Sequence, residues 1–354
     1  MGFKKMTKEL KTVKSGELIS FATKVFQFYG LNYADSALWA EVLVWANLRG
    51  VDSHGVLRIP LYTEYLEKGI INSTPNLQVD PLSGAIAKLH SDLATGPVAL
   101  KKGMEEAISK AEEFNLGWCA ISNMTHAGAI GFFSLLAAEK GFAGIVMTAS
   151  QPMMAYPGTH KNVVSTNPIA ISIPGNLHPP LLLDMSTSTV GMGKVLQARD
   201  SGEKIPNDWG LDNRGNSTTD PNELKVLSPL GGAKGAGLSL MIECLTSLAV
   251  NNPIIEPVLR TGAPLNGRPI NGVAIALDIS MFGEKDLVGK QVDDLVKQLH
   301  SVGKSEGVKN IYAPGERGDA IKTKRQKSGI PLATGTIQRL KEVAIKCNVK
   351  LPID

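Results

Sequence analysis

Apolar residues near the start of the chain recur every three or four positions, the spacing that places them on one face of an α-helix. The first run predicts a helix that begins at Gly16, is capped by Ser15 and ends at Gly30. Its apolar face carries Leu18, Ala22, Val25 and Tyr29. A second helix is expected from Asp35 to Gly50 and a third over residues 60–68, so the beginning of the chain is predicted to be helical.

From about residue 80, short apolar segments alternate with helical patterns. Expected helices cover residues 97–114 and 129–140, and expected strands cover residues 118–122, 144–150, 169–173 and 181–185. This order of short strands and helices indicates an α/β lobe.

The last part of the chain begins with residues 198–228, which are rich in Gly, Asn, Asp, Pro and Thr and predict a long ordered loop. A glycine cluster at residues 231–237 then opens an apolar helix that ends near Val250. A strand at residues 273–279, a helix at 292–300, a polar loop that contains Pro314-Gly315-Glu316, and a last helix from Thr336 are expected to follow.

The composition fits a protein with a large buried core. Of 354 residues, 43% are apolar and 20% are charged, which argues against disorder and favours two domains or two lobes. The net charge of +4 is too mild to indicate binding to nucleic acid or to a membrane. The basic residues 1–14 lack the apolar core of a secretory signal, and no apolar run reaches the roughly 18 residues of a membrane span. Three cysteines without a C-x-x-C pair indicate reduced thiols in a cytoplasmic protein.

The densest group of reactive side chains follows the second predicted helix, where Ser53 and His54 precede Arg58 and Tyr62. A histidine transfers protons near neutral pH, an adjacent serine can relay or orient, and an arginine binds a carboxylate through two parallel hydrogen bonds. Taken singly, His54 can equally cap a carbonyl and Arg58 can form a surface ion pair. Taken together, the four residues favour a catalytic and substrate-binding cluster.

Two further segments carry polar groups at strand ends. His126 lies between a predicted strand and helix, among small residues that allow a ligand close to the backbone, although a solvent-facing loop histidine explains it as well. Asp184 follows an apolar strand and can bind ribose hydroxyls or cap a helix. Lys194, soon after, serves either acid–base chemistry or solvation.

Residues 231–237 form the best phosphate candidate, because successive backbone N–H groups, Lys234 and a helix dipole favour an anion. The alternative is a glycine turn before a buried helix. The chain has no G-x-G-x-x-G after a strand and no P-loop, which excludes the motifs of an ordinary Rossmann or P-loop protein. No zinc motif is present, so no metal is expected.

A series of short segments, taken in order, resembles the malate/L-lactate dehydrogenase type 2 family, which includes ureidoglycolate and sulfolactate dehydrogenases and piperideine-carboxylate reductases. The matching segments are Asp52-Ser53-His54-Gly55 with Arg58, His126-Ala127-Gly128-Ala129-Ile130, Ser165-Thr166-Asn167-Pro168, Asp184-Met185-Ser186-Thr187-Ser188, Ile205-Pro206 with Trp209, Asp212 and Gly215, Thr218-Thr219-Asp220-Pro221, Pro229-Leu230-Gly231-Gly232 with Lys234-Gly235, and Pro314-Gly315-Glu316.

The resemblance implies an α/β, non-Rossmann fold with a helical lobe from both chain ends, residues 1–78 joined by about 230–354, and an α/β nucleotide-binding lobe at 79–229. It implies a homodimer and an NAD cofactor, with NADP as an alternative. It matches Ser53 and His54 to a relay serine and a proton-donating histidine, and Arg58 and Thr166 to substrate-binding positions. It matches the cofactor-binding positions to His126, Ala127, Gly128, Ala129, Ile130, Asp184, Met185, Ser186, Lys234, Gly235, Gly315 and Glu316.

We therefore expect a dehydrogenase of a small anionic 2-hydroxy or 2-keto acid, malate or L-lactate, with ureidoglycolate as the alternative within the family. Arg58 would hold the substrate carboxylate and His54 would move the proton, with His126 as the other candidate base. Ser53 and Lys194 would orient the base. A cyclic imine reductase is a second interpretation, although Lys194 stands where that branch has an acidic residue. A nucleotide-binding regulator without activity is a third, and the Ser53–His54–Arg58 cluster argues against it.

Overall fold

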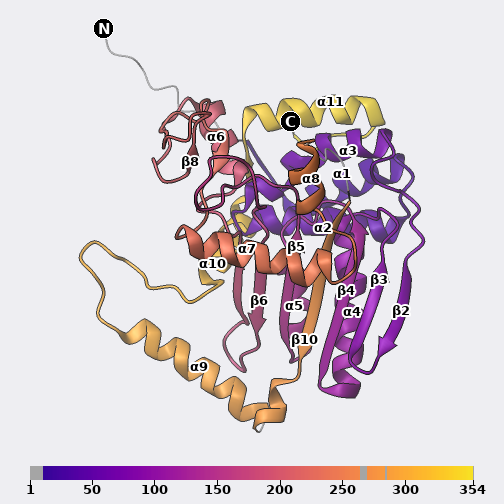
Figure 1. Ribbon diagram of the computed structural model, residues 1–354, viewed down its shortest axis with the longest axis vertical. Coiled ribbons are helices and arrows are strands. Elements are labelled where there is room, and N and C mark those ends of the chain that lie inside the picture. Colours follow the sequence, from indigo (N-terminus) through magenta and orange to yellow (C-terminus); the bar gives the residue numbers. More distant parts are fainter. Residues whose placement is uncertain (1–10, 264–268, 284, 354) are drawn as a thin grey trace. The chain divides into compact units, whose positions relative to one another are not determined.

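The computed structural model describes residues 11–263, 269–283 and 285–353, so most of the basic stretch expected at residues 1–14 lies outside it (Figure 1). The chain divides into two compact units, Met1–Thr74 with Arg317–Asp354, and Pro75–Glu316. The sequence predicted that the residues from about 230 onward join the first unit, whereas in the structure only the residues from 317 onward do so. The reason is strand β10 (Ile270–Leu277), which is hydrogen-bonded between β4 and β5 in the sheet of the second unit.

The first unit is mainly helical and joins both chain ends. Its helices are α1 (Ser15–Phe28), α2 (Tyr33–Leu48), α3 (Ile59–Glu67), α10 (Glu316–Ser328), whose first residue belongs to the second unit, and α11 (Thr334–Cys347). Strands β1 (Lys11–Val13) and β11 (Ile330–Leu332) pair antiparallel. The core centres on Trp39, whose ring stacks on Phe26 at 4.0 Å between centroids and contacts Tyr62 at 4.9 Å.

Two local expectations for this unit need correction. Ser15 is the first residue of α1 and makes no capping hydrogen bond from its side chain. The helix α10 was not predicted, because its sequence is almost wholly polar and none of its residues is buried. Hydrophobic periodicity cannot reveal a helix that has no apolar face.

The second unit is built on a seven-stranded sheet with strand order β2-β3-β4-β10-β5-β6-β7. Strands β3 and β4 are parallel, and the other neighbouring pairs are antiparallel. This is a mixed α/β arrangement, as expected, and its strands at residues 169–173 and 181–185 have the predicted bounds. The strands are β2 (Gln78–Ser83), β3 (Ile86–His90), β4 (Leu116–Met124), β5 (Ala143–Ala149), β6 (Ile169–Ile173) and β7 (Leu181–Met185).

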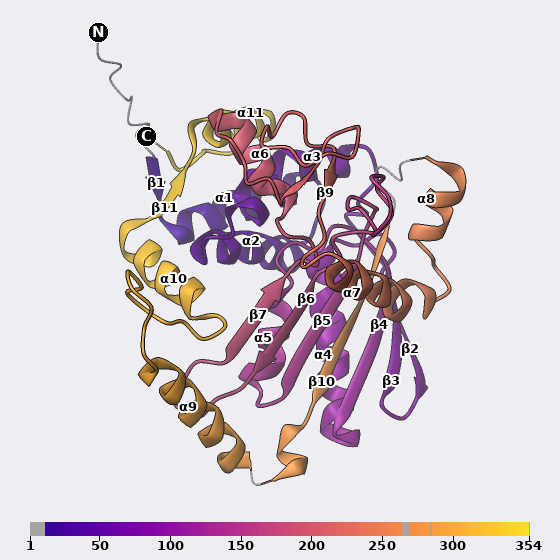
Figure 2. The same ribbon diagram turned by 60° about the vertical axis from the view of Figure 1, so that its left-hand side comes forward.

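Helices α4 (Gly96–Phe114) and α5 (Gly131–Glu139) cover one face of this sheet, and α7 (Ala233–Glu243) with the π-helical turn Cys244–Leu248 crosses the other (Figure 2). The stretch expected as a loop at 198–228 begins inside α6 (Met192–Ser201) and contains the short paired strands β8 (Gly210–Leu211) and β9 (Val226–Leu227). The remaining helices are α8 (Ile255–Thr261) and α9 (Lys285–Ser301). Among the helices that the structure describes, none has the length and apolar character to cross a membrane.

Candidate active site

The first unit brings the predicted cluster together in two consecutive 3₁₀ turns, Asp52–His54 and Val56–Arg58. The Ser53 hydroxyl lies 3.1 Å from Nδ1 of His54. Nε of Arg58 donates to the carbonyl oxygen of Ser53 over 2.8 Å. The short sequence separation therefore translates directly into contact, and the serine, the imidazole and the guanidinium form one group.

The electrostatics of this group favour a neutral imidazole beside an uncompensated cation. Burial and the nearby Arg58 guanidinium lower the pKa of His54 to about 4. In the part of the chain that the structure describes, no carboxylate lies within ion-pair distance of Arg58, although its side chain is half-buried. A partly buried arginine is normally paired with an acid. The arrangement is therefore suited to an anionic ligand supplied from outside the chain.

The turn that carries Ser53 and His54 is held by residues that sequence reasoning did not select. The amide of Asn47, at the end of α2, donates to Asp52 over 2.6 Å and accepts from the backbone N–H of Val56 over 2.9 Å. Arg325 in α10 forms a bidentate pair with Asp52 at 2.7 and 3.0 Å. No local sequence signal marks Arg325, because its partner lies 273 residues away.

Tyr62 was expected to contact substrate, but the structure shows its ring in the core of the first unit. Its side chain is 1% exposed and packs on Trp39. Burial raises the pKa of its hydroxyl to about 12, against the opposing effect of Arg58. Its clear contribution is to packing, and a contact with substrate stays a prediction.

In the second unit, His126 lies in the loop between β4 and α5. Its Nδ1 accepts a hydrogen bond from the backbone N–H of Gly128 over 3.2 Å. Since a backbone N–H can only donate, a neutral His126 must carry its proton on Nε2. Gly128 has a φ of +72°, which favours glycine at this turn. The loop continues through buried Ala127, Ala129 and Ile130.

Asp184, at the end of β7, contacts this same loop. Its Oδ2 accepts from the backbone N–H of Gly131, the first residue of α5, over 3.0 Å. A Cβ at Gly131 would lie 2.7 Å from that oxygen, so the close approach requires glycine. The carboxylate thus caps α5, one of the two roles expected for Asp184. Because Asp184 is exposed, the other role, a contact with ribose, remains compatible with this cap.

The segment after Asp184 also joins the other two predicted segments. The backbone N–H of Thr187 donates to the carbonyl of Thr166 over 3.3 Å, and the carbonyl of Thr187 accepts from the N–H of Leu230 over 2.9 Å. Gly235 packs against this junction, where a Cβ would lie 2.4 Å from the Thr187 oxygen. Residues 184–189 therefore connect the His126 loop, Thr166 and the glycine cluster within one unit.

The glycine cluster offers fewer backbone donors than its sequence suggested. The N–H groups of Gly232, Lys234, Gly235 and Ala236 all donate to carbonyls within residues 229–232. Among the described residues, the N–H groups of Gly231 and Ala233 have no such acceptor. Two donors at the start of α7, with the exposed Lys234 beside them, are what remains for an anion.

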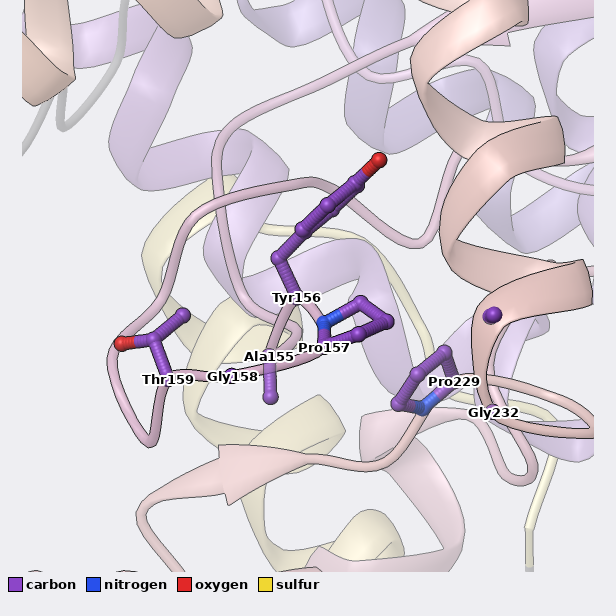
Figure 3. A pocket seen from close by; sticks show the side chains of 8 residues that line it. Ala155, Tyr156, Pro157, Gly158, Thr159, Pro229 and Gly232 are labelled. Carbon is purple, nitrogen blue, oxygen red and sulfur yellow. The ribbon is translucent and has the colours of Figure 1, made fainter.

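A pocket of about 290 Å³ opens at this helix start (Figure 3). Figure 3 shows the 155–159 loop on one side of it and Pro229 with Gly232 on the other. A Cβ at Gly232 would meet nothing within 4 Å, so the backbone faces open space. The pocket walls are mainly apolar, formed by Ala155, Tyr156, Pro157, Gly158, Thr159, Pro229, Gly232 and Ala233.

The remaining predicted residues have less distinctive surroundings. Lys194 is exposed in α6 and forms no ion pair within the described chain. Met185 ends β7, and the Ser186 hydroxyl lies 3.0 Å from that of Ser188. Gly315, with a φ of +99°, packs against Leu182 of β7.

The carboxylate of Glu316 is occupied within the second unit. It contacts Nε2 of His178 at 2.9 Å and Nε2 of His300 at 2.8 Å, and accepts from the backbone N–H of Ala313 at 2.6 Å. Burial raises the pKa of Glu316, but these hydrogen bonds outweigh burial and lower it. A nucleotide contact by this side chain would have to compete with those partners.

Comparison with known proteins shows the family of this chain. The malate/L-lactate dehydrogenase family model matches residues 13–341. The chain is 35% identical to a malate/(S)-sulfolactate dehydrogenase of Methanothermus fervidus over 94% of this chain and 97% of that protein. It is also 35% identical to an NAD(+) ureidoglycolate dehydrogenase of Escherichia coli, covering 88% of this chain and 89% of that one.

The fold agrees as well. The crystal structure of a malate dehydrogenase from Entamoeba histolytica superposes with a TM-score of 0.90 and 28% identity, over 97% of this chain and 100% of that one. Similarity of this extent, in both sequence and fold, covers both units and every segment of the candidate site. The chain therefore belongs to the malate/L-lactate dehydrogenase family and is a dehydrogenase that acts on a CH–OH group.

Proposed function

We propose that this dehydrogenase interconverts a small 2-hydroxy acid and its 2-keto acid, with malate or L-lactate as substrate and NAD as cofactor. The observation that carries the proposal is the half-buried Arg58 guanidinium, without an acidic partner in the described chain, beside the Ser53–His54 pair. A substrate carboxylate would supply the missing anion through two parallel hydrogen bonds.

His54 suits the role of proton acceptor better than His126 does. The Ser53 hydroxyl can either donate to or accept from Nδ1 of His54, so Nε2 can present a lone pair to the substrate hydroxyl. The bond from Gly128 N–H leaves a neutral His126 protonated on Nε2, where it can only donate. His54 therefore takes the hydroxyl proton in oxidation and returns it in reduction, while Ser53 holds the ring in either tautomer.

A nicotinamide cofactor would supply the hydride acceptor or donor when bound. The residues at the start of α7 fit its phosphates, because Ala233 N–H, Lys234 and an unobstructed Gly232 backbone favour an anion. The pocket of about 290 Å³ is at the small end of the range for ligand sites, so it suits one part of a dinucleotide. We assign His126 and its loop, Asp184–Ser186 and Gly315–Glu316 to further cofactor contacts. Thr166 is assigned to substrate, and Lys194 to orienting the base.

The test is oxidation of 2-hydroxy acids by the wild type with NAD and with NADP, followed by reduced-nicotinamide absorbance. The panel contains malate, L-lactate, sulfolactate and ureidoglycolate, with a cyclic imine carboxylate in the reductive direction. We expect a 2-hydroxy acid to be the best substrate and His54→Ala to lower kcat about 10²–10⁴-fold with little change in NADH affinity. Turnover of the imine alone would refute the proposed substrate class. Near-normal activity of His54→Ala would assign the role of proton acceptor to His126.

We also propose that the chain forms a homodimer through the sheet face opposite α4 and α5. Helix α7 packs on the middle of that face, where its Ile242 clusters with Ile145 and Ile275. The in-register apolar row that crosses six strands there ends in Ile86 and Leu183, which are 46% and 38% exposed. An apolar strip of this kind is typical of an interface. Sedimentation of Ile86→Glu, a change at the exposed end of the row, should show a monomer, whereas an unchanged dimer would place the interface elsewhere.

A further inference from the structure

The geometry points to Arg325 as a positioning residue for proton transfer, acting through Asp52 and Asn47 on the turn that carries Ser53 and His54. This inference rests on the role proposed for His54. Arg325 lies in α10, a helix near the carboxyl end of the chain, and would act only through the residues that it holds.

Arg325 holds both the first residue of the turn and the end of the helix before it. Nη1 and Nη2 donate to the two carboxylate oxygens of Asp52 over 2.7 and 3.0 Å, and Nη1 also donates to the carbonyl oxygen of Asn47. The Arg325 side chain is 15% exposed, so solvent screens the pair only partly. Two parallel hydrogen bonds fix direction as well as distance, which one point charge does not.

Asn47 carries the constraint to the other end of the turn. Its side chain is buried, with Nδ2 donating to Asp52 and Oδ1 accepting from the N–H of Val56. It passes so close to Gly55 that a Cβ there would lie 2.2 Å from Oδ1. Ser53 and His54 therefore lie in a segment clamped at Asp52 and at Val56.

The same clamp determines where the guanidinium of Arg58 lies, because its Nε donates to the Ser53 carbonyl. A shift of the turn would move the base and the carboxylate-binding group together. Misplacement by about 1 Å can lower the rate of an enzyme reaction about 10²-fold. Loss of the Arg325 contacts should thus lower turnover more than it lowers the binding of cofactor, whose proposed contacts are in the second unit.

A neighbouring ion pair provides a matched control. Arg49, the residue that follows α2, pairs with Asp319 of α10, so this pair also attaches α10 to the end of α2. The pair itself includes neither Asp52 nor Asn47, whereas Arg325 bonds to both. Removing it tests the attachment of α10 alone, whereas removing Arg325 tests the hold on the turn.

The experiment compares Arg325→Met, Arg325→Lys and Asp319→Asn in the full-length protein, each checked for folding by thermal unfolding. We expect Arg325→Met to lower kcat about 10- to 100-fold, with the Kd for NADH within about 2-fold of wild type. Arg325→Lys should recover part of the loss, and Asp319→Asn should stay within about 2-fold of wild type in kcat. Equal losses in Arg325→Met and Asp319→Asn, or none in Arg325→Met, would overturn the inference.

A readout independent of turnover separates this inference from the proposed function. The ring Cε1–H resonance of His54, assigned by its disappearance in His54→Ala, reports the surroundings of the imidazole. It should shift in Arg325→Met and stay in place in Asp319→Asn.

If the resonance shifts while His54→Ala retains activity, the positioning holds and the proposed base is wrong. An unshifted resonance with a fully inactive His54→Ala overturns the positioning alone. Should Arg325→Met fail to fold, Asp52→Asn removes the same bidentate pair and is scored in the same way.

Discussion

The pH dependence of the two directions of the reaction follows from the lowered pKa of His54. Burial and Arg58 bring it from an ordinary value of 6.5 to about 4. At pH 7, about one molecule in 10³ then carries the imidazolium, against about one in four for an ordinary histidine. Oxidation needs the neutral ring and reduction needs the protonated one, so the free enzyme is prepared for oxidation.

The predicted profiles are therefore unequal. For oxidation, titration of His54 should leave kcat/KM constant from about pH 5 to 8 and lower it only near pH 4. For reduction, kcat/KM should rise about tenfold for each pH unit lowered from 7 toward 4, because that parameter reports the free enzyme. A bound carboxylate offsets the Arg58 charge, so the limb in kcat should lie at higher pH than the limb in kcat/KM.

Initial rates in both directions, measured by reduced-nicotinamide absorbance, provide the assay. Because the folded pKa of His54 lies below its unfolded value, its contribution to stability is complete above about pH 6.5 and declines as pH falls toward 4. Each acidic rate therefore needs a control in which the enzyme is returned to neutral pH and regains activity. Arg58→Met should move the oxidation limb upward. A wild-type limb near pH 6.5, unchanged in Arg58→Met, would refute the assignment of the base.

Three further substitutions test other parts of the site. Gly235→Ala should lower Tm and weaken NADH binding, because its Cβ would lie 2.6 Å from the backbone of Leu230. Gly237→Ala on the same helix meets nothing within 4 Å and should be neutral or stabilising by up to about 1 kcal/mol. If the two variants changed Tm and the Kd for NADH equally, the steric argument would be wrong. Arg58→Lys should raise the substrate KM at least about tenfold because the bidentate geometry is lost, and an unchanged KM would place the carboxylate elsewhere. Gly55→Ala should lower kcat strongly, since its Cβ would lie 2.2 Å from the asparagine amide that holds the turn, and full activity in a kinetic assay would show that the turn tolerates displacement.

Local contacts are the part of the site that the sequence alone determined. Ser53, His54 and Arg58 lie within six positions and meet through two turns, and His126 contacts Gly128 two residues away. Side chains so close along the chain have little freedom to separate, so their grouping can be inferred without knowing the fold. The strands at residues 169–173 and 181–185 were predictable for a similar reason, since their apolar runs are local.

Only the tertiary structure decided the contacts that cross the chain. Strand β10 enters the middle of the sheet, Asp184 reaches Gly131, and Arg325 reaches Asp52 from 273 residues away. The polar helix α10 has no apolar periodicity, so no sequence pattern predicts the helix or the contact of its Arg325 with Asp52. Such contacts depend on how whole elements pack, and each polar group then finds whichever partner the packing brings within hydrogen-bonding distance. The sequence thus determined which groups can react, and the packing decided what holds them in place.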